Sequence, residues 1–430
     1  MRRNEGPKQR IVVIGGGFAG LNLVKHLAKD KWDVIIIDAN NFHSFPPLFY
    51  QLASGGLDAG SISFPLRREM RSRRMKGCRY RMGEVLDIDT TRHEVRTQYE
   101  FIPYDKLVIA CGTTNNFYGI TDLRKYVYTL KSTAEAIRCR NDILDRLERA
   151  AITPDAAERR RLLSFVIVGG GPTGVEIAGA LGEMKRYILK REYPDINPDD
   201  VTVTLVEGSD ALLRGMSAQS SRQVLKDLKH LCVDVRLGRI MKGYDGRTLT
   251  FADGETMESE MVIWTSGVTG VSFTFKGVKP EIAPGNRITV DAFNRVVGVD
   301  NVFAIGDIAY RSTPDYPRGL PQLAQVAIQG AKCLAANLNA GTFTREFRYK
   351  DLGAMATVGR NRALVDMKHL HLHGRIAWLM WMGVHLMSIL GMRNRLTVFI
   401  TWVWAYFTYS SSLRLLLRIT RYPLRSHWTH

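Results

Sequence analysis

Cysteine is scarce in this sequence, and its few copies are scattered. The 430 residues contain five cysteines, an odd number, and no two of them have Cys-x-x-Cys spacing. This count argues against a disulfide framework and favours a reducing compartment. It also leaves no redox cysteine pair of the kind that a disulfide reductase needs. The five are Cys78, Cys111, Cys139, Cys232 and Cys333.

No stretch of the sequence is apolar for long enough to span a membrane. The most hydrophobic stretches cover residues 376–390 and 398–407, and each falls short of the roughly 20 residues that a spanning helix needs. An earlier apolar run starts at Ile11 and leads directly into a glycine turn, so it is interpreted as a strand and not as a secretory signal. A proton pump is not expected, because proton relays use several spans with charges inside the membrane.

Acidic residues are outnumbered by basic ones, 42 to 60, which gives a formal net charge of +18. Such an excess bears on partners rather than on fold, and it is compatible with anionic lipid, nucleic acid or anionic cofactors. The basic run at residues 67–76 is interpreted as a solvated face of a short helix rather than as a nucleic-acid contact. The length predicts about three domains, at roughly 150 residues each.

Two segments have the pattern of an apolar strand, a glycine turn and a helix. The strands cover residues 11–14 and 165–168. In such a unit the first glycine permits a tight turn, the second lets the backbone approach a pyrophosphate, and the third lets helix and strand pack closely. The negative charge of the ligand then lies at the helix N-terminus. The glycines are Gly15, Gly17 and Gly20 in the first turn and Gly169, Gly171 and Gly174 in the second.

An acidic residue ends the strand that follows each glycine turn. These residues are Asp38 and Glu207, and a carboxylate there can accept a hydrogen bond from a ribose hydroxyl. Glu207 would also repel a 2′-phosphate, which favours NADH over NADPH. One glycine fingerprint is weak evidence, but two copies in this context predict two dinucleotide sites. The expected fold class is α/β, with two Rossmann-like dinucleotide-binding domains and a C-terminal amphipathic membrane-anchoring region.

Three further buried strands end at small residues or at a carboxylate. Small residues at such a turn let the backbone close on a cofactor. A helix is expected behind Pro321, over residues 320–337. The strand ends are marked by Gly112 and Thr113, by Gly267, and by Gly306 with Asp307.

The last 80 residues differ in character from the rest of the chain. The two apolar stretches are followed by basic residues at helical spacing, with leucines between them. Basic and apolar residues in this arrangement are typical of a helix that lies in a membrane interface and contacts anionic headgroups. A buried pair of dimerisation helices is the alternative, so a homodimer stays open. The basic residues are Arg414, Arg418, Arg421 and Arg425.

These features together resemble the type II NADH dehydrogenases, which are single-subunit, non-proton-pumping NADH:quinone oxidoreductases of the FAD/NAD-linked reductase fold. The resemblance covers nearly the whole chain, from Ile11 to about Tyr422. Besides the two glycine turns, it rests on His43 to Gln51, Cys111 to Thr113, Trp264 to Val268, Gly306-Asp307, the segment Ala324 to Gln329, and the Trp-rich C-terminus.

The resemblance implies which residues hold each cofactor. FAD, bound non-covalently, is assigned to the first glycine turn, Asp38 and Asp307, and NADH is assigned to the second turn and Glu207. The Ala-Gln-x-Ala-x-Gln segment is assigned to the quinone site beside the flavin, through Gln325 and Gln329. Two positions depart from the family pattern. The family often has a glycine one residue further on after the second glutamine, whereas here Gly330 follows Gln329 directly. Cys111 stands where a small residue, often Thr, is usual. The remaining cofactor contacts are Phe18, Ala19, Gly112, Thr113, Gly267, Gly306 and Ala324.

The resemblance also implies the reaction, the domain boundaries and the location. NADH reduces FAD, and the reduced flavin passes two electrons to a membrane quinone of the respiratory chain. Glu176 is placed where nicotinamide and flavin meet. It relays a proton, orients ligands, or serves only as a carboxylate at a helix N-terminus. The chain is expected to be peripheral on the cytoplasmic face of the cell inner membrane. The domains are expected at 1–117 with 299–350 for FAD, 118–298 for NADH, and 351–430 for membrane association.

Two other functions compete with this interpretation. A sulfide:quinone oxidoreductase is also a membrane-peripheral flavoprotein, but it uses redox cysteines and needs no second fingerprint ending in Glu207. A basic flavoprotein that senses NADH or binds nucleic acid is supported only by the net charge, and it would bind DNA in a salt-sensitive way. That alternative leaves Gln325, Gln329 and the Trp-rich C-terminus unexplained, so nucleic acid is not an expected partner.

Overall fold

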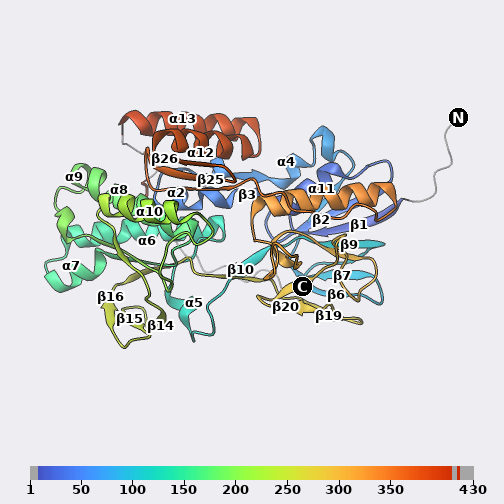
Figure 1. The fold of residues 1–430 in the computed structure, drawn as a ribbon, viewed down its shortest axis with the longest axis horizontal. Coiled ribbons are helices and arrows are strands. Elements are labelled where there is room, and N and C mark those ends of the chain that lie inside the picture. Colours follow the sequence, from blue (N-terminus) through green and yellow to red (C-terminus); the bar gives the residue numbers. More distant parts are fainter. Residues whose placement is uncertain (1–7, 409–413, 417–430) are drawn as a thin grey trace, which may run out of the picture. The chain divides into compact units, whose positions relative to one another are not determined.

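The computed structural model of the chain describes residues 8–408 and 414–416. Contacts divide the chain into two compact units. The first unit comprises the described residues up to Phe45 together with Ser63–Asn116 and Gly267–Gly353. The second comprises Pro46–Ile62, Phe117–Ser266 and the described residues from Ala354 onward. Each unit is built around a parallel sheet of its own (Figure 1).

The first unit contains a five-stranded parallel sheet in the order β22-β9-β1-β2-β5. Aliphatic residues of β1, β2 and β9 are almost completely buried, as expected for a parallel sheet that is covered on both faces. Helix α1 follows β1 and packs along α11. The elements are β1 (Gln9–Ile14), α1 (Phe18–His26), β2 (Trp32–Asp38), β5 (Arg79–Met82), β9 (Lys106–Ile109), β22 (Val302–Ala304) and α11 (Ala324–Ala340).

Smaller sheets complete the first unit. Strands β6 and β7 form an antiparallel hairpin, which continues into β8 on one side and β19 on the other. The pairs β10–β18 and β3–β4 and the sheet β20-β21-β23 make short connections. Their bounds are β3 (Phe42–Ser44), β4 (Ser63–Pro65), β6 (Val85–Asp89), β7 (Glu94–Thr97), β8 (Phe101–Pro103), β10 (Thr113–Asn115), β18 (Val268–Gly270), β19 (Thr274–Lys276), β20 (Ile282–Ala283), β21 (Arg287–Thr289) and β23 (Ala309–Tyr310).

The basic run at 67–76 is not the single helix that the sequence predicts. It contains α4 (Leu66–Glu69) and the short 3₁₀ helix η2 (Arg73–Met75), separated by Ser72 in an extended conformation. Arginines four residues apart repel each other along a helix, which disfavours a longer one. The arginines and Lys76 are largely exposed, while Leu66 and Met75 are buried.

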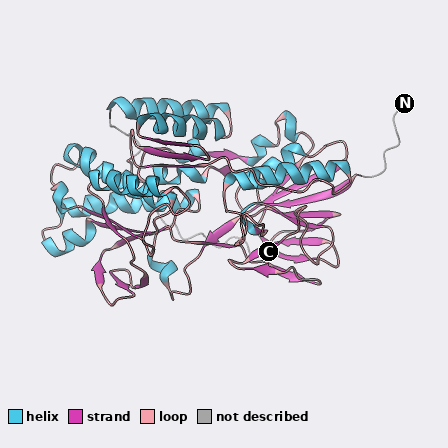
Figure 2. Ribbon diagram, viewed as in Figure 1, coloured by secondary structure: helices cyan, strands magenta, loops and turns pink. Residues whose placement is uncertain are grey.

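The second unit repeats the strand-turn-helix device in a four-stranded parallel sheet with the order β13-β12-β11-β17. Helix α8 follows β11, and its end continues through a π-helical segment, η3, into α9. Strands and helices of the unit are distinguished in Figure 2. The elements are β11 (Ser164–Val168), α8 (Pro172–Glu183), η3 (Met184–Ile188), α9 (Leu189–Glu192), β12 (Thr202–Val206), α10 (Ala218–His230), β13 (Asp234–Arg236) and β17 (Met261–Trp264).

Further elements of the second unit surround this sheet. The long helix α6 begins with a capping box, in which Ser132 and Glu135 bond each other's main chain. Helix α2 lies in the segment Pro46–Ile62, which belongs to the second unit although it interrupts the first unit in the sequence. It packs on both α6 and α8. The bounds are α2 (Phe49–Ala53), α3 (Ala59–Ile62), α5 (Leu123–Tyr126), α6 (Thr133–Ile152), α7 (Ala156–Leu162), β14 (Met241–Tyr244), β15 (Thr248–Phe251) and β16 (Thr256–Glu258).

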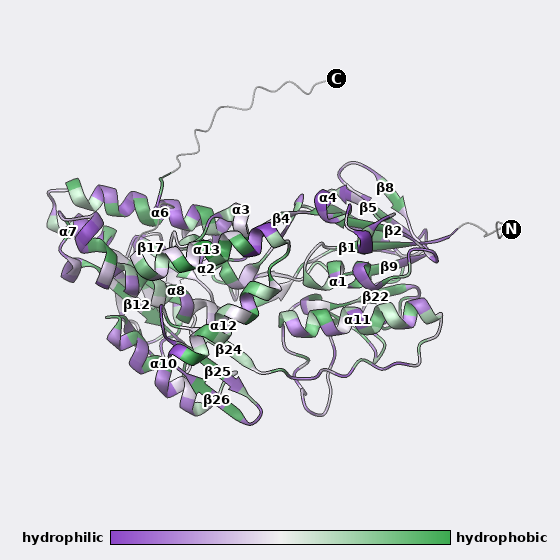
Figure 3. Cartoon of the chain, turned by 90° about the horizontal axis from the view of Figure 1, so that it is seen from above, coloured by the Kyte–Doolittle hydropathy of each residue, from purple (hydrophilic) through white to green (hydrophobic). Residues whose placement is uncertain are grey.

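The C-terminal part of the second unit is an antiparallel sheet followed by two helices. The sheet comprises β24 (Ala354–Thr357), β25 (Ala363–Met367) and β26 (Leu370–His373), and the helices are α12 (Arg375–Ser388) and α13 (Met392–Thr408). The two helices pack against each other, and hydrophobic residues recur along both (Figure 3). Within the described ranges, every helix is too short or too polar to cross a bilayer.

The apolar residues of α13 divide between two faces. Val398 and Trp402 are buried against the unit, whereas Ile400, Trp404 and Phe407 are 63%, 64% and 77% exposed. Helix α12 has the same division, with Trp381 buried and Leu379 exposed. Most of the basic segment expected after residue 410 lies outside the described residues. Arg414 is described, and it forms an ion pair with Glu192.

Candidate functional site

The first glycine turn has the geometry that the sequence predicts. Gly15 has a φ of +108°, which L side chains rarely adopt, and a Cβ there would collide with the main chain at Ala110. A Cβ on Gly20 would overlap the carbonyl oxygen of Gly15, so α1 packs directly on the turn. Around Gly17, by contrast, there is open space. That space lies at the N-terminus of α1, where backbone N–H groups attract an anion.

Asp38 connects the end of β2 to this turn. Its Oδ2 accepts a hydrogen bond of 2.6 Å from the backbone N–H of Gly16, and Oδ1 accepts one of 2.7 Å from Asn40. Burial raises the pKa of the Asp38 carboxyl, although these bonds oppose the shift. His43 Nδ1 lies 2.9 Å from the carbonyl oxygen of Gly16, and burial lowers its pKa to about 4. A neutral His43 therefore donates to Gly16 and stabilises the turn.

The first unit brings other predicted residues to the same turn. Gly306 has a φ of +75°, and its Cα lies so close to Ala19 and Ala327 that an added Cβ would be 3.1 Å and 3.5 Å from their methyl groups. Asp307 follows in the 3₁₀ helix η5 (Gly306–Ile308). The glycine turn, α1, η5 and α11 therefore form one cluster, with Ala324 as the first residue of α11.

The two glutamines of α11 have different surroundings. The amide of Gln329 is bonded at both ends to the main chain of Lys350, by two bonds of 3.0 Å. In this structure Gln329 therefore fastens the segment after α11. Gln325 is half-buried one turn earlier, next to Ala324.

The β10–β18 pair brings together three more of the predicted cofactor contacts. Thr113 pairs with Gly270, and the N–H of Asn116 donates to the carbonyl oxygen of Gly267 at 3.3 Å. Gly112 has a φ of +71° and open space around its Cα. Thr113 thus belongs to a small antiparallel ladder of the first unit, and Gly112 and Gly267 directly precede its two strands, at opposite ends of the ladder.

The second glycine turn reproduces the first inside the second unit. Gly169 has a φ of +116°, and a Cβ on Gly174 would overlap the carbonyl oxygen of Gly169. Gly171, like Gly17, faces open space. Glu207 takes the place of Asp38, because its Oε2 accepts a 2.6 Å bond from the N–H of Gly170. Its Oε1 accepts two bonds of 2.7 Å from Ser209.

Glu176 lies one turn into α8 and is buried, with 7% of the residue exposed. Burial raises the pKa of its carboxyl far above the ordinary value, while a bond from the backbone N–H of Thr357 opposes the shift. This environment therefore favours the protonated, neutral form of the Glu176 carboxyl. The Tyr50 hydroxyl lies within electrostatic range of it.

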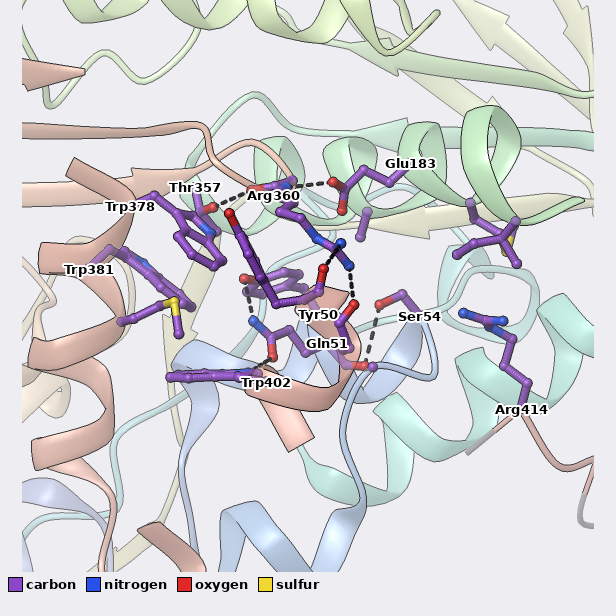
Figure 4. Close-up of a pocket in the computed structure, with 18 residues that line it drawn as sticks. Tyr50, Gln51, Ser54, Glu183, Thr357, Arg360, Trp378, Trp381, Trp402 and Arg414 are labelled. Carbon is purple, nitrogen blue, oxygen red and sulfur yellow. Dashed lines mark hydrogen bonds between the residues drawn. The ribbon is translucent and has the colours of Figure 1, made fainter. Parts of the chain in front are cut away.

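A cavity of about 160 Å³ opens in the second unit between α2, α8, the β24–β25 turn and the helices α12 and α13 (Figure 4). Its wall includes Tyr50 and Thr357, the two residues that interact with Glu176. Three indole rings and two phenol rings contribute aromatic surface to the wall. These belong to Trp378, Trp381, Trp402, Tyr50 and Tyr406.

Charged groups form one end of the cavity. The backbone N–H of Arg360 donates to Glu183 Oε1 at 2.5 Å. The guanidinium of Arg360 donates to the carbonyl oxygens of Ala405 and Tyr406 at 2.6 and 2.8 Å. Arg360 thus caps the last turn of α13, where the helix dipole favours a cation.

Two residues at these sites, Glu183 and Arg287, have structural contacts that no sequence pattern predicts. Glu183 follows Glu176 by two helical turns and so shares its face of α8, a spacing that is visible in the sequence. Arg287 is 8% exposed and donates to the carbonyl oxygens of Ala309 and Leu320, which ties the strand after Asp307 to the segment before α11. No local pattern marks an arginine of this kind.

Two family profiles together match nearly all of the chain. The profile for pyridine nucleotide-disulphide oxidoreductases matches residues 9–331. The profile for the NDH2 C-terminal domain matches residues 352–409, which contain β24–β26, α12 and α13.

Curated relatives and solved structures agree with these profiles. The type II NADH:quinone oxidoreductase Ndh of Mycobacterium tuberculosis is 32% identical over 96% of this chain and 90% of its own length. The internal alternative NAD(P)H-ubiquinone oxidoreductase A1 of Arabidopsis thaliana is 32% identical over 93% of this chain and 84% of its own. NDH2 from Plasmodium falciparum in complex with NADH has the same fold, with a TM-score of 0.87, 21% identity, and coverage of 96% of this chain and all of that one. The chain therefore belongs to the type II NADH:quinone oxidoreductases, enzymes that oxidise NADH and reduce a quinone without pumping protons.

Proposed function

We propose that electrons cross this enzyme through FAD held by the first unit. The open space at Gly17, the N-terminus of α1 and the carboxylate of Asp38 fit a dinucleotide, and Asp307 would be a further contact. FAD, when bound, supplies the hydride and electron chemistry. Anaerobic addition of NADH to purified protein should bleach a flavin absorbance, and subsequent quinone should restore it. A purified protein without a flavin spectrum would refute the proposal.

NADH is assigned to the second glycine turn, supported by the open space at Gly171 and the position of Glu207. The Glu207 carboxylate already accepts three bonds, and it still has lone-pair directions for a ribose hydroxyl. We expect Glu207→Gln to narrow the preference for NADH over NADPH, because the repulsion of a 2′-phosphate is removed. The ratio of kcat/KM for the two cofactors measures this, and an unchanged ratio would exclude Glu207 from the pocket.

The quinone is assigned to the aromatic cavity of the second unit. The separate assignment of Gln325 and Gln329 of α11 to a quinone site stays a prediction. Indole rings suit a planar ring, and the cavity volume of about 160 Å³ suits one headgroup. The net reaction, NADH + H⁺ + quinone → NAD⁺ + quinol, takes up one proton from solution. Protonated Glu176 is a suitable last donor for that proton, since it lies behind Tyr50 and Thr357 in the cavity wall.

The exposed apolar faces of α12 and α13 are assigned to a lipid surface. We expect Leu379→Glu, Ile400→Glu and Phe407→Glu in one protein to lower its partitioning into lipid vesicles by on the order of a thousandfold, because burying each such side chain contributes about 1.5–3 kcal/mol. A control with Phe101→Glu, Ile152→Glu and Val278→Glu alters comparably exposed apolar residues elsewhere. Equal losses in both proteins, measured by co-sedimentation, would contradict the assignment.

The enzyme is further proposed to lie on the cytoplasmic face of the cell inner membrane, where NADH is available to it. A reducing compartment agrees with the five cysteines, all of which are free. NADH oxidation by sealed inside-out vesicles, but not by sealed right-side-out vesicles, is the expected result. The opposite sidedness would place the protein on the other face.

A further inference from the structure

Three side chains in the cavity wall form a chain of hydrogen bonds. The indole Nε1 of Trp402, on α13, donates to Gln51 Oε1 at 2.8 Å. Gln51 Nε2, on α2, donates to the hydroxyl oxygen of Tyr50 at 2.8 Å. Figure 4 shows the three side chains around the cavity. All three belong to the second unit.

The indole N–H of Trp402 determines the direction of both hydrogen bonds. An indole N–H can donate a hydrogen bond but cannot accept one, so the oxygen of the Gln51 amide must face Trp402. The amide NH₂ then faces Tyr50, and the phenol oxygen must accept. Tyr50 consequently keeps its own hydroxyl hydrogen available for donation to another group.

No acceptor for that hydrogen lies among the residues that the structure describes. Tyr50 is 5% exposed, so bulk water offers little replacement. Burial raises the pKa of the hydroxyl well above its ordinary value, which keeps the hydrogen in place at physiological pH. A buried donor without an acceptor is unfavourable. The cavity next to it can supply that acceptor through a ligand.

We propose that Tyr50 donates a hydrogen bond to a carbonyl oxygen of the quinone, and that Gln51 and Trp402 are positioning residues that fix its direction. This inference rests on the proposed quinone cavity. A quinone ring has carbonyl acceptors and no donors of its own, which complements a wall with an unused donor. Negative charge grows on a carbonyl oxygen as electrons arrive, so a donor fixed in advance stabilises that charge most.

Tyr50→Phe tests the donor. It removes one hydroxyl and keeps the ring that packs against Trp381. We expect reoxidation of NADH-reduced flavin by a decyl-substituted benzoquinone to slow by about tenfold to a hundredfold, since loss of one such donor typically costs up to 10²–10³. Flavin reduction by NADH should be unaffected. The matched control is Tyr244→Phe, which removes another buried hydroxyl of the same unit, bonded to the carbonyl oxygen of Ser259.

Gln51→Glu and Trp402→Phe test the direction of the two hydrogen bonds. An ionised carboxyl at 51 only accepts, so it would turn the Tyr50 hydrogen away from the cavity, whereas a protonated one can still donate to Tyr50. We therefore expect Gln51→Glu to slow flavin reoxidation as pH rises, more steeply than in the wild type. Trp402→Phe frees the amide to rotate, and we expect a slowing of several fold at every pH, smaller than that of Tyr50→Phe.

The outcomes separate this inference from the function on which it rests. If wild-type flavin is not reoxidised by the quinone, the proposed electron path itself is wrong. If the wild type is reoxidised and Tyr50→Phe matches Tyr244→Phe, the donor role of Tyr50 is wrong while the path stands. If Tyr50→Phe is slow but Gln51→Glu has the wild-type pH profile, the positioning role of Gln51 is refuted. A loss confined to flavin reduction by NADH would overturn all three assignments.

Discussion

Gly171→Ala should give a folded, flavin-containing protein that NADH reduces very slowly. A Cβ at Gly171 meets no protein atom within 4 Å, and the backbone there has an ordinary φ of −73°, so the fold tolerates alanine. The same Cβ would occupy the space through which a pyrophosphate approaches the backbone. Displacing the cofactor by about 1 Å can slow transfer by about 10²-fold. We expect the apparent NADH affinity and the flavin reduction rate to fall together.

Gly17→Ala is the counterpart in the first unit. Its Cβ also meets open space, so we expect a folded protein that has lost FAD rather than NADH. Gly243→Ala, a third glycine with open space around it, is the control for the substitution itself. Thermal unfolding, flavin content after gel filtration and stopped-flow reduction distinguish the three proteins. If Gly17→Ala and Gly171→Ala both kept flavin and NADH reduction, the two turns would not be the nucleotide sites.

The glycine turns could be predicted from sequence because the backbone there accepts only glycine. At Gly15 and Gly169 a positive φ is required, and at Gly20 and Gly174 a Cβ would collide with the main chain. These constraints are local, since a positive φ belongs to the turn itself and the collisions at Gly20 and Gly174 are with the carbonyl oxygens of Gly15 and Gly169 in the same turns. The two parallel sheets follow from the same segments, because fully apolar strands that alternate with helices pair in parallel.

The cavity could not be predicted in the same way. Gln51 and Trp402 are 351 residues apart, and nothing in either local sequence indicates that their side chains meet. The buried face of α13 is equally hard to recognise, because Val398 and Trp402 on that face are as apolar as Ile400 and Phe407 on the outer one. A sequence reveals which face of a helix is buried only when the opposite face is polar, and the second half of α13 has no charged residue. Burial of Glu176 likewise depends on β24, which begins far along the chain at Ala354.

Glu176→Gln should abolish most quinone reduction while leaving flavin reduction by NADH nearly intact. The amide keeps the size of the carboxyl and can still accept the bond from Thr357, but it cannot supply a proton. Loss of a positioned proton donor typically slows a step by 10²–10⁴-fold. In the wild type, reoxidation should slow as pH rises through the raised pKa of Glu176, and the variant should lack that dependence. Asp227→Asn, which alters another buried carboxyl, is the control.

Glu176→Gln is also expected to change how the free energy of unfolding depends on pH. Between the ordinary pKa of 4.5 and the raised pKa of the folded protein, the unfolded chain has lost the Glu176 proton and the folded chain has kept it. The contribution of this group to the free energy of unfolding is therefore full below pH 4.5 and falls as pH rises through that window. Glu176→Gln should remove this slope and leave the variant relatively more stable at alkaline pH. Unfolding by urea between pH 5 and 9 measures the slope, and parallel pH profiles for both proteins would mean that Glu176 is ionised in the folded enzyme and is not the proton donor.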